Sequence, residues 1–90
     1  METRSLRRRE TLIWRKVGDE VVILNEEGTQ LCHLNQTAAH IWTLADGTKT
    51  LPEIADGVCE RFEVSPAEAL GDVQELTQQL VEAGLAEWSG

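Results

Sequence analysis

The sequence predicts an α+β fold of winged-helix-like type, in which a three-stranded antiparallel meander is followed by three α-helices. The segment 11–34 is rich in β-forming residues that are divided by turn signals, and from residue 35 onward the apolar residues recur with helical spacing. The chain has 90 residues, of which 41% are hydrophobic, enough for one compact core. We expect a single domain over residues 11–90, preceded by a flexible basic arm over residues 1–10.

The three strands are expected at 11–17, 20–25 and 29–34. A Gly-Asp pair at 18–19 and the sequence Asn-Glu-Glu-Gly at 25–28 mark the two hairpin turns. In a meander the third strand lies at an edge of the sheet, and this strand carries no Pro, Lys or Glu to discourage further pairing. It can therefore accept a strand from a peptide. A homodimer contact or the N-terminal arm could cover the same edge instead.

Three helices are expected after the strands, each with a capping residue. Asn35 caps a helix over 36–46, Thr50 opens a capping box with Glu53, and Ser65 opens the third helix, which runs to Ala83. The segment 85–88 follows as a short extended tail that resembles the wing of a winged-helix domain.

The third helix carries two neighbouring lines of residues. The expected core stripe consists of Ala69, Val73, Leu76, Leu80 and Ala83. The second line is mixed apolar and polar and consists of Leu70, Gln74, Thr77 and Val81. This second line suits the rim of a peptide groove, or else it is the margin of a wide core face.

The net charge of −8 is unevenly distributed. Residues 1–16 hold six basic residues against two acids, a formal charge of +4, whereas the rest holds two basic residues against 14 acids, a charge of −12. The last two helices could form a helix-turn-helix pair, but the third helix carries four carboxylates and no Lys or Arg. Those carboxylates would repel phosphates, so we expect no nucleic acid partner.

The sequence shows no pattern for catalysis or for a bound cofactor. We find no Ser-His-Asp order, Gly-rich phosphate loop or paired carboxylates, so we expect no enzyme activity, catalytic residue or cofactor. Cys32 and His33 are adjacent in a strand and point to opposite faces, which argues against a metal site. No apolar segment reaches the length of a membrane span and no signal peptide is visible, so we expect a cytoplasmic protein with no membrane partner.

Five short motifs follow one another between residues 34 and 85. They are the segment 34–42 with its Leu-Asn pair and its Trp, the Asp-Gly pair 46–47, the Thr-led segment 50–55, the Asp-Val pair 72–73 and the Gly-Leu pair 84–85. In this order they resemble the PqqD family, the small pyrroloquinoline quinone biosynthesis protein D and its relatives. The resemblance covers roughly residues 11–88, with Gln36-Thr37 in place of the more usual Glu-Thr.

The resemblance implies a non-catalytic adaptor that binds the leader of a ribosomally synthesised precursor peptide and presents it to a modifying enzyme. In pyrroloquinoline quinone biosynthesis that peptide is PqqA and the enzyme is the radical SAM protein PqqE. The family's peptide lies as an added strand on the third strand, against the third helix. Carried over by position, the peptide-binding residues are Thr29, Gln30, Leu31, Cys32, His33, Leu70, Val73, Gln74, Thr77 and Val81.

Two other functions remain open at this point. One is a winged-helix DNA-binding transcriptional regulator, for which the basic arm would supply the phosphate contacts. The other is a purely structural subunit that stabilises a larger enzyme without touching the peptide.

Overall fold

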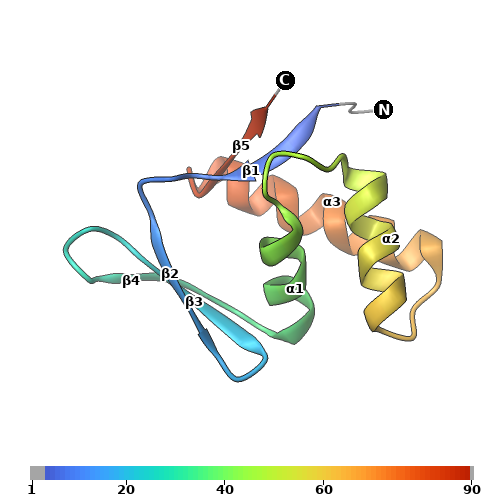
Figure 1. Ribbon diagram of the computed structural model, residues 1–90, viewed down its shortest axis with the longest axis horizontal. Helices are drawn as coiled ribbons and strands as arrows, with labels where there is room; N and C mark the ends of the chain where they lie inside the picture. Colours follow the sequence, from blue (N-terminus) through green and yellow to red (C-terminus); the bar gives the residue numbers. More distant parts are fainter. Residues whose placement is uncertain (1–3, 90) are drawn as a thin grey trace.

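The computed structural model describes residues 4–89, which form eight helices and strands in the order β1, β2, β3, β4, α1, α2, α3 and β5 (Figure 1). Their bounds are Ser5–Arg8 for β1, Ile13–Val17 for β2, Glu20–Leu24 for β3, Gln30–Leu34 for β4, Gln36–Leu44 for α1, Leu51–Arg61 for α2, Pro66–Glu82 for α3 and Ala86–Ser89 for β5. Residues 1–3 of the expected arm and residue 90 lie outside the described part of the chain.

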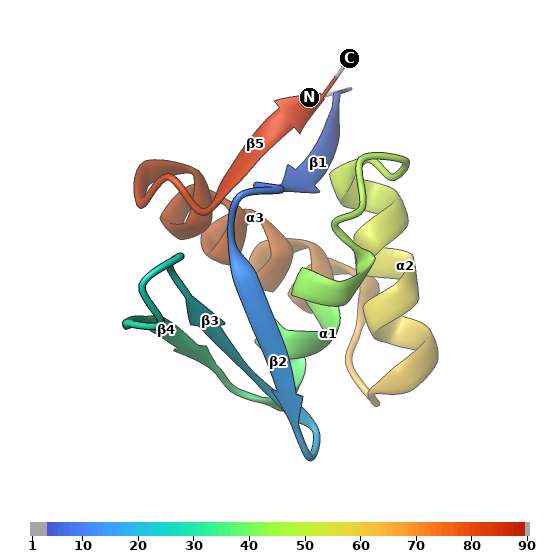
Figure 2. The same ribbon diagram turned by 60° about the vertical axis from the view of Figure 1, so that its left-hand side comes forward.

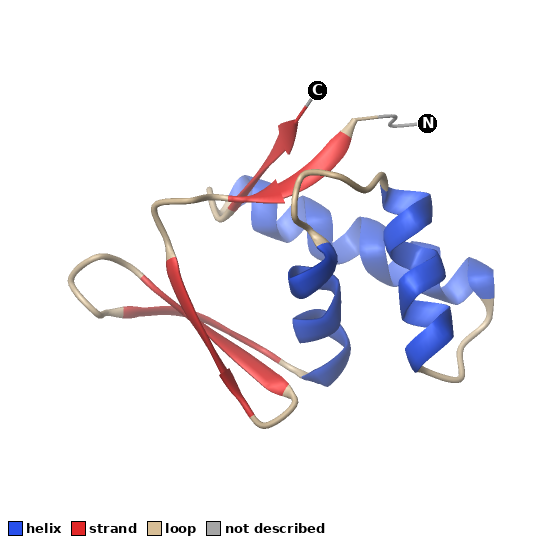
Figure 3. Ribbon diagram, in the orientation of Figure 1, coloured by secondary structure: helices blue, strands red, loops and turns tan. Residues whose placement is uncertain are grey.

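The predicted α+β class is confirmed, with the meander β2-β3-β4 followed by the three helices. Both strand pairs are antiparallel, and the helices lie together on one side of the meander (Figure 3). The helices begin where the sequence places their caps. The Asn35 side chain accepts a hydrogen bond from the Ala38 N–H at 3.0 Å, and the Ser65 hydroxyl accepts one from the Glu68 N–H at 3.2 Å. The Thr50 N–H donates to the Glu53 carboxylate at 2.9 Å.

The expected flexible arm is wrong for residues 5–8, which form β1 and pair with β5 in a second antiparallel sheet. Leu6 in this strand is fully buried. The Arg8 guanidinium donates to the carbonyls of Trp42 and Thr43 at 2.8 and 2.9 Å, so it caps the C-terminal end of α1. Arg7 forms an ion pair with Glu87 on the opposite strand at 3.1 Å. These arginines are therefore part of the fold.

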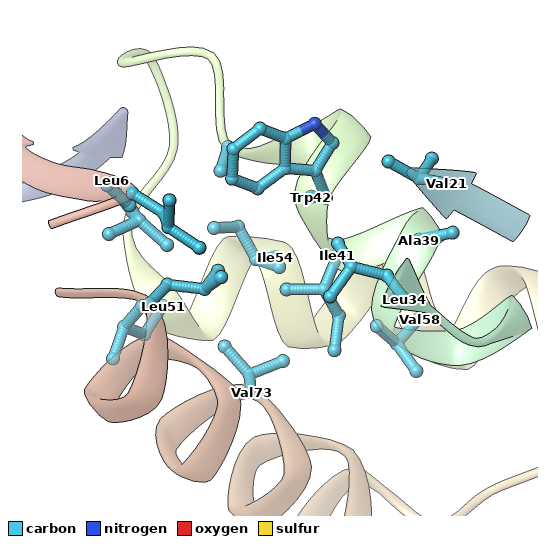
Figure 4. Packing of buried hydrophobic residues seen from close by; sticks show 14 of the residues in the cluster. Leu6, Val21, Leu34, Ala39, Ile41, Trp42, Leu51, Ile54, Val58 and Val73 are labelled. Atoms are coloured by element: carbon cyan, nitrogen blue, oxygen red, sulfur yellow. The ribbon is translucent and has the colours of Figure 1, made fainter. Parts of the chain in front are cut away.

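The core lies between the inner face of the meander and the three helices. Figure 4 shows Leu6 and Leu51 at one end of the cluster and Val21 and Leu34 at the other, with Ile54 and Trp42 between them. Burial of apolar surface on this scale is the main stabilising contribution to a small domain. The cluster ties β1 to the helices, so both sheets depend on the same core.

The core face of α3 differs from the expected stripe at three positions. Thr77 is 2% exposed and belongs to the core, whereas Leu76 is only partly buried and Ala83 is exposed. The core face is instead formed by Ala69, Val73, Thr77 and Leu80. The observed core face is thus rotated about the axis of α3 relative to the expected stripe. As a result, Leu76 and Ala83 line a surface groove. Within residues 4–89, no helix is both long and apolar enough to cross a membrane.

Candidate functional site: a groove beside an edge strand

A groove with a volume of about 390 Å³ lies between β4 and the C-terminal half of α3. Figure 2 shows that α3 runs toward the meander, so its C-terminal end is the end nearest β4. The groove is lined by Leu31, Cys32, His33, Leu34, Asn35, Ala38, Leu76, Gln79, Leu80, Ala83 and Leu85. Most of these side chains are apolar, so the groove can hold apolar side chains of a ligand.

The β4 side of the groove is a continuous stretch of backbone. Four consecutive residues, 31–34, line it, and within the described residues β4 pairs only with β3. The pairing is irregular, because Ile23 lies opposite Cys32 while Leu24 lies opposite Gln30. This β-bulge leaves Leu31 without an opposite residue, and bulges of this kind redirect side chains. Leu31 is 46% exposed at the mouth of the groove.

The other edge of the meander is β2, which differs from β4 in its charge. β2 carries Arg15 and Lys16, and exposed basic residues discourage the addition of a strand. β4 carries His33, whose Nε2 lies 2.6 Å from the Glu20 carboxylate on β3. The edge that borders the groove is therefore also the edge better suited to accept a strand.

The α3 side of the groove is formed by Leu76, Gln79 and Ala83. At 3.6 residues per turn these three positions lie within roughly 60° of one another around the helix. They lie beside the core residue Leu80, which forms part of the groove floor. One flank of α3 therefore faces β4, and two of its residues, Leu76 and Ala83, belong to the core stripe that the sequence predicts.

The strand residues expected to bind peptide fall into two groups. Leu31, Cys32 and His33 line the groove. Gln30 is the first residue of β4, and Thr29 precedes the strand, where its N–H donates to the Asn25 side chain at 2.8 Å. Thr29 and Gln30 therefore sit at the turn end of β4, outside the lining of the groove.

The helix residues expected to bind peptide lie elsewhere on α3. Val73 is fully buried and Leu70 is partly buried. Gln74, Thr77 and Val81 line a different groove, of about 330 Å³, whose remaining lining residues are Leu51, Gln78, Glu82 and Trp88. The structure thus does not bring these helix residues together with β4. The residue that could have indicated the flank facing β4 is Leu76, an apolar side chain at the border of the core stripe.

The first groove offers backbone hydrogen bonding and apolar contact rather than reactive groups. Cys32 and Cys59 are free thiols, and in residues 4–89 no group of three or more His, Cys, Asp and Glu side chains is placed to hold a metal ion. The exposed surface of α3 carries Glu68, Asp72, Glu75 and Glu82, which disfavours contact with a phosphate backbone. These features suit a peptide ligand and give no support to DNA binding.

Comparison with known proteins assigns the chain to a protein family. A family model described as Coenzyme PQQ synthesis protein D (PqqD) matches residues 20–86. The chain belongs to the PqqD family. The matched region includes the meander from β3 onward and all three helices, so it contains both sides of the groove. No curated protein sequence matches the chain.

Two solved structures share the PqqD-type fold of this chain. One is TbiB1 in complex with the TbiA(beta) leader peptide, with a TM-score of 0.77 and 26% identity over 90% of this chain and 94% of that one. The other is lasso peptide synthetase B1 complexed with the leader peptide, with a TM-score of 0.75 and 25% identity over 92% of this chain and 98% of that one. Both structures contain a bound leader peptide.

Proposed function

We propose that this PqqD-family chain binds the leader of a ribosomally synthesised precursor peptide as an added strand on β4. The observation that carries the proposal is that β4, an edge strand that pairs only with β3 within residues 4–89, supplies four consecutive residues to an apolar groove. In strand addition, main-chain hydrogen bonds supply affinity and pockets for alternate side chains supply specificity. The leader peptides bound to the two similar structures support the same class of ligand.

The proposed contact set combines sequence and structure. Its strand part is Leu31, Cys32 and His33, as the sequence predicted, with Thr29 and Gln30 at the far end of the same strand. Its helix part is Leu76, Gln79 and Ala83, which replace the residues on the other flank of α3. This replacement puts both halves of the site on one groove.

The proposed role is that of a non-catalytic adaptor that presents the bound peptide to a modifying enzyme. An added strand leaves the rest of a peptide free, so the segment beyond the leader can reach a second protein. In the pyrroloquinoline quinone pathway the peptide would be PqqA and the enzyme the radical SAM protein PqqE. A homodimer formed through β4 would occupy the peptide's place, so dimerisation through this strand and leader binding should compete.

The test is a titration of the ¹⁵N-labelled protein with synthetic candidate leader peptides, PqqA among them. We expect the largest amide shifts at residues 30–34 and at Leu76, Gln79 and Ala83. Shifts concentrated at Gln74, Thr77 and Val81 would instead place the peptide on the other flank of α3. Shifts that appear on dilution without peptide would reveal a dimer through β4.

A further inference from the structure

The groove beside β4 continues into a second cavity of about 310 Å³. The two cavities share Asn35, Ala38, Leu76 and Gln79, so they form one continuous trough. The second cavity is completed by Thr37, Ile41, Asp72 and Glu75. One end of the trough is therefore apolar, and the other end is lined by two carboxylates.

The two carboxylates have no cationic partner in the described part of the chain. Asp72 and Glu75 are both exposed, lie three residues apart on α3, and take part in none of the ion pairs formed within residues 4–89. Like charges at this spacing repel each other on a helix. A cation that entered this end of the trough would relieve the repulsion, and the net charge of −8 favours its approach.

The position of the acidic end relative to β4 fixes where the cation would lie on a bound strand. β4 runs from Gln30 to Leu34, and the next residue, Asn35, borders both cavities. The carboxylates therefore lie past the C-terminal end of β4. A strand added antiparallel, the commoner pairing and the one used throughout this meander, brings its N-terminal residues to that end.

We propose that Asp72 and Glu75 select a peptide that carries Lys or Arg on the N-terminal side of its strand-forming apolar segment. The inference rests on the function proposed above and adds the charge and polarity of the ligand to it. The apolar segment occupies the part of the trough beside Leu31, Ala83 and Leu85. The basic side chain extends past Leu34 to the two carboxylates.

The test uses the full-length protein and a display library of random short peptides, so no natural ligand needs to be known. The library is selected against the wild type, against D72N/E75Q, and against the control E60Q/E82Q, which removes the same charge from exposed sites outside the trough. Selected peptides are resynthesised, and their affinities are measured by fluorescence anisotropy at low and at physiological ionic strength.

We expect peptides selected by the wild type and by E60Q/E82Q to carry Lys or Arg ahead of their apolar residues. Peptides selected by D72N/E75Q should lack this enrichment. A basic peptide from the wild-type selection should bind D72N/E75Q about three- to tenfold more weakly, as expected for two exposed ion pairs, with a smaller effect of salt. Its affinity for the control should stay within about twofold of wild type.

Three results would overturn the inference in different ways. Equal enrichment of basic residues by all three proteins would show that the overall charge, not the trough, selects them. Strand-forming binders without basic residues would refute the charge selection and leave leader binding intact. A library that yields no binder to any of the three proteins would contradict the proposed function and the inference together.

Discussion

The two flanks of α3 border grooves of similar size and different construction. The groove beside β4 has a volume of about 390 Å³, and the groove on the opposite flank has a volume of about 330 Å³. The first is lined by four consecutive residues of an edge strand. In the second, β5 contributes only Trp88 and α2 only Leu51. Volume alone therefore does not distinguish a peptide site, whereas a continuous backbone along one wall does.

The groove on the second flank is also connected to the β1–β5 sheet, because Trp88 of β5 lines it. Trp88 lies opposite Leu6 in the β1–β5 pair, and the Arg4 guanidinium lies 5.3 Å from the centre of the Trp88 ring. Leu6 in turn is buried in the core. We therefore expect changes on this side to affect folding stability, and changes on the β4 side to affect peptide affinity.

The largest expected effect is that of L6A on stability. Removing a fully buried leucine side chain leaves a cavity and should cost about 2–5 kcal/mol of the free energy of unfolding. The matched control is L31A at the mouth of the groove, where the side chain is 46% exposed and the expected cost is below about 1 kcal/mol. Urea denaturation followed by Trp fluorescence measures both. Equal stabilities for wild type and L6A would show that β1 is not part of the fold.

The next largest effect is on leader affinity, which should differ between substitutions on the two flanks of α3. L76Q places an amide in the apolar part of the first groove, and should weaken leader affinity about tenfold or more. V81T makes a comparable polar change on the opposite flank, and its affinity should stay within about twofold of wild type. Isothermal titration calorimetry gives both values, with thermal denaturation as the check on folding. The reverse ranking would move the peptide to the second flank.

A smaller effect is expected at the core residue that borders the second groove. Within residues 4–89 the buried Thr77 hydroxyl has no hydrogen-bond partner, so T77V should raise the free energy of unfolding by about 1 kcal/mol without changing peptide affinity. The control is T43V, because the Thr43 hydroxyl donates to the Ala39 carbonyl at 2.9 Å and its loss should destabilise. A T77V protein that is less stable than wild type would show that this hydroxyl does have a partner.

The features predictable from the sequence are those set by local patterns. Turn signals and capping residues place the meander and the three helices within one or two residues, because Asn35, Thr50 and Ser65 act on their own backbone neighbours. The edge position of β4 follows from strand order alone. The family follows from motifs that the sequence displays in order.

The features that the sequence did not predict depend on long-range packing. β1 is a four-residue strand with one buried apolar residue, and its partner β5 lies about 80 positions away, so no local pattern reveals it. The rotation of α3 is similar in kind. Thr77 and Leu76 are neighbours, hydrophobicity favours Leu76 for the core, and only the packing of α3 against α2 and β5 places Thr77 there instead.

The smallest expected effect is on the pH dependence of stability. It concerns the loop after α1, whose residues Gly47 and Lys49 form backbone hydrogen bonds with Leu6 of β1. The Thr48 hydroxyl and N–H donate to the Asp46 carboxylate, and together with Lys49 they lower its pKa from 3.8 to about 2. Because the folded-state pKa is the lower one, this stabilisation is present above about pH 4 and is lost as the pH falls toward 2. Asp46 is exposed, so the contribution should stay below about 1 kcal/mol.

The variant D46N tests this contribution against D56N, which removes an exposed carboxylate from α2. The Gly47 N–H donates to the Leu6 carbonyl at 2.9 Å, and the Leu6 N–H donates to the Lys49 carbonyl at 3.1 Å, so the Asp46 turn anchors β1. D46N should therefore lower the denaturation midpoint at about pH 6, and lower it less at about pH 3, where wild type has begun to lose the same interaction. D56N should show no such pH-dependent difference.

The same variant also tests whether the β1 side and the β4 side of the molecule are independent. Because the Asp46 turn lies on the β1 side, leader affinity at about pH 6 should be the same for D46N and wild type. A weakened affinity would show that the two sides are coupled through the core.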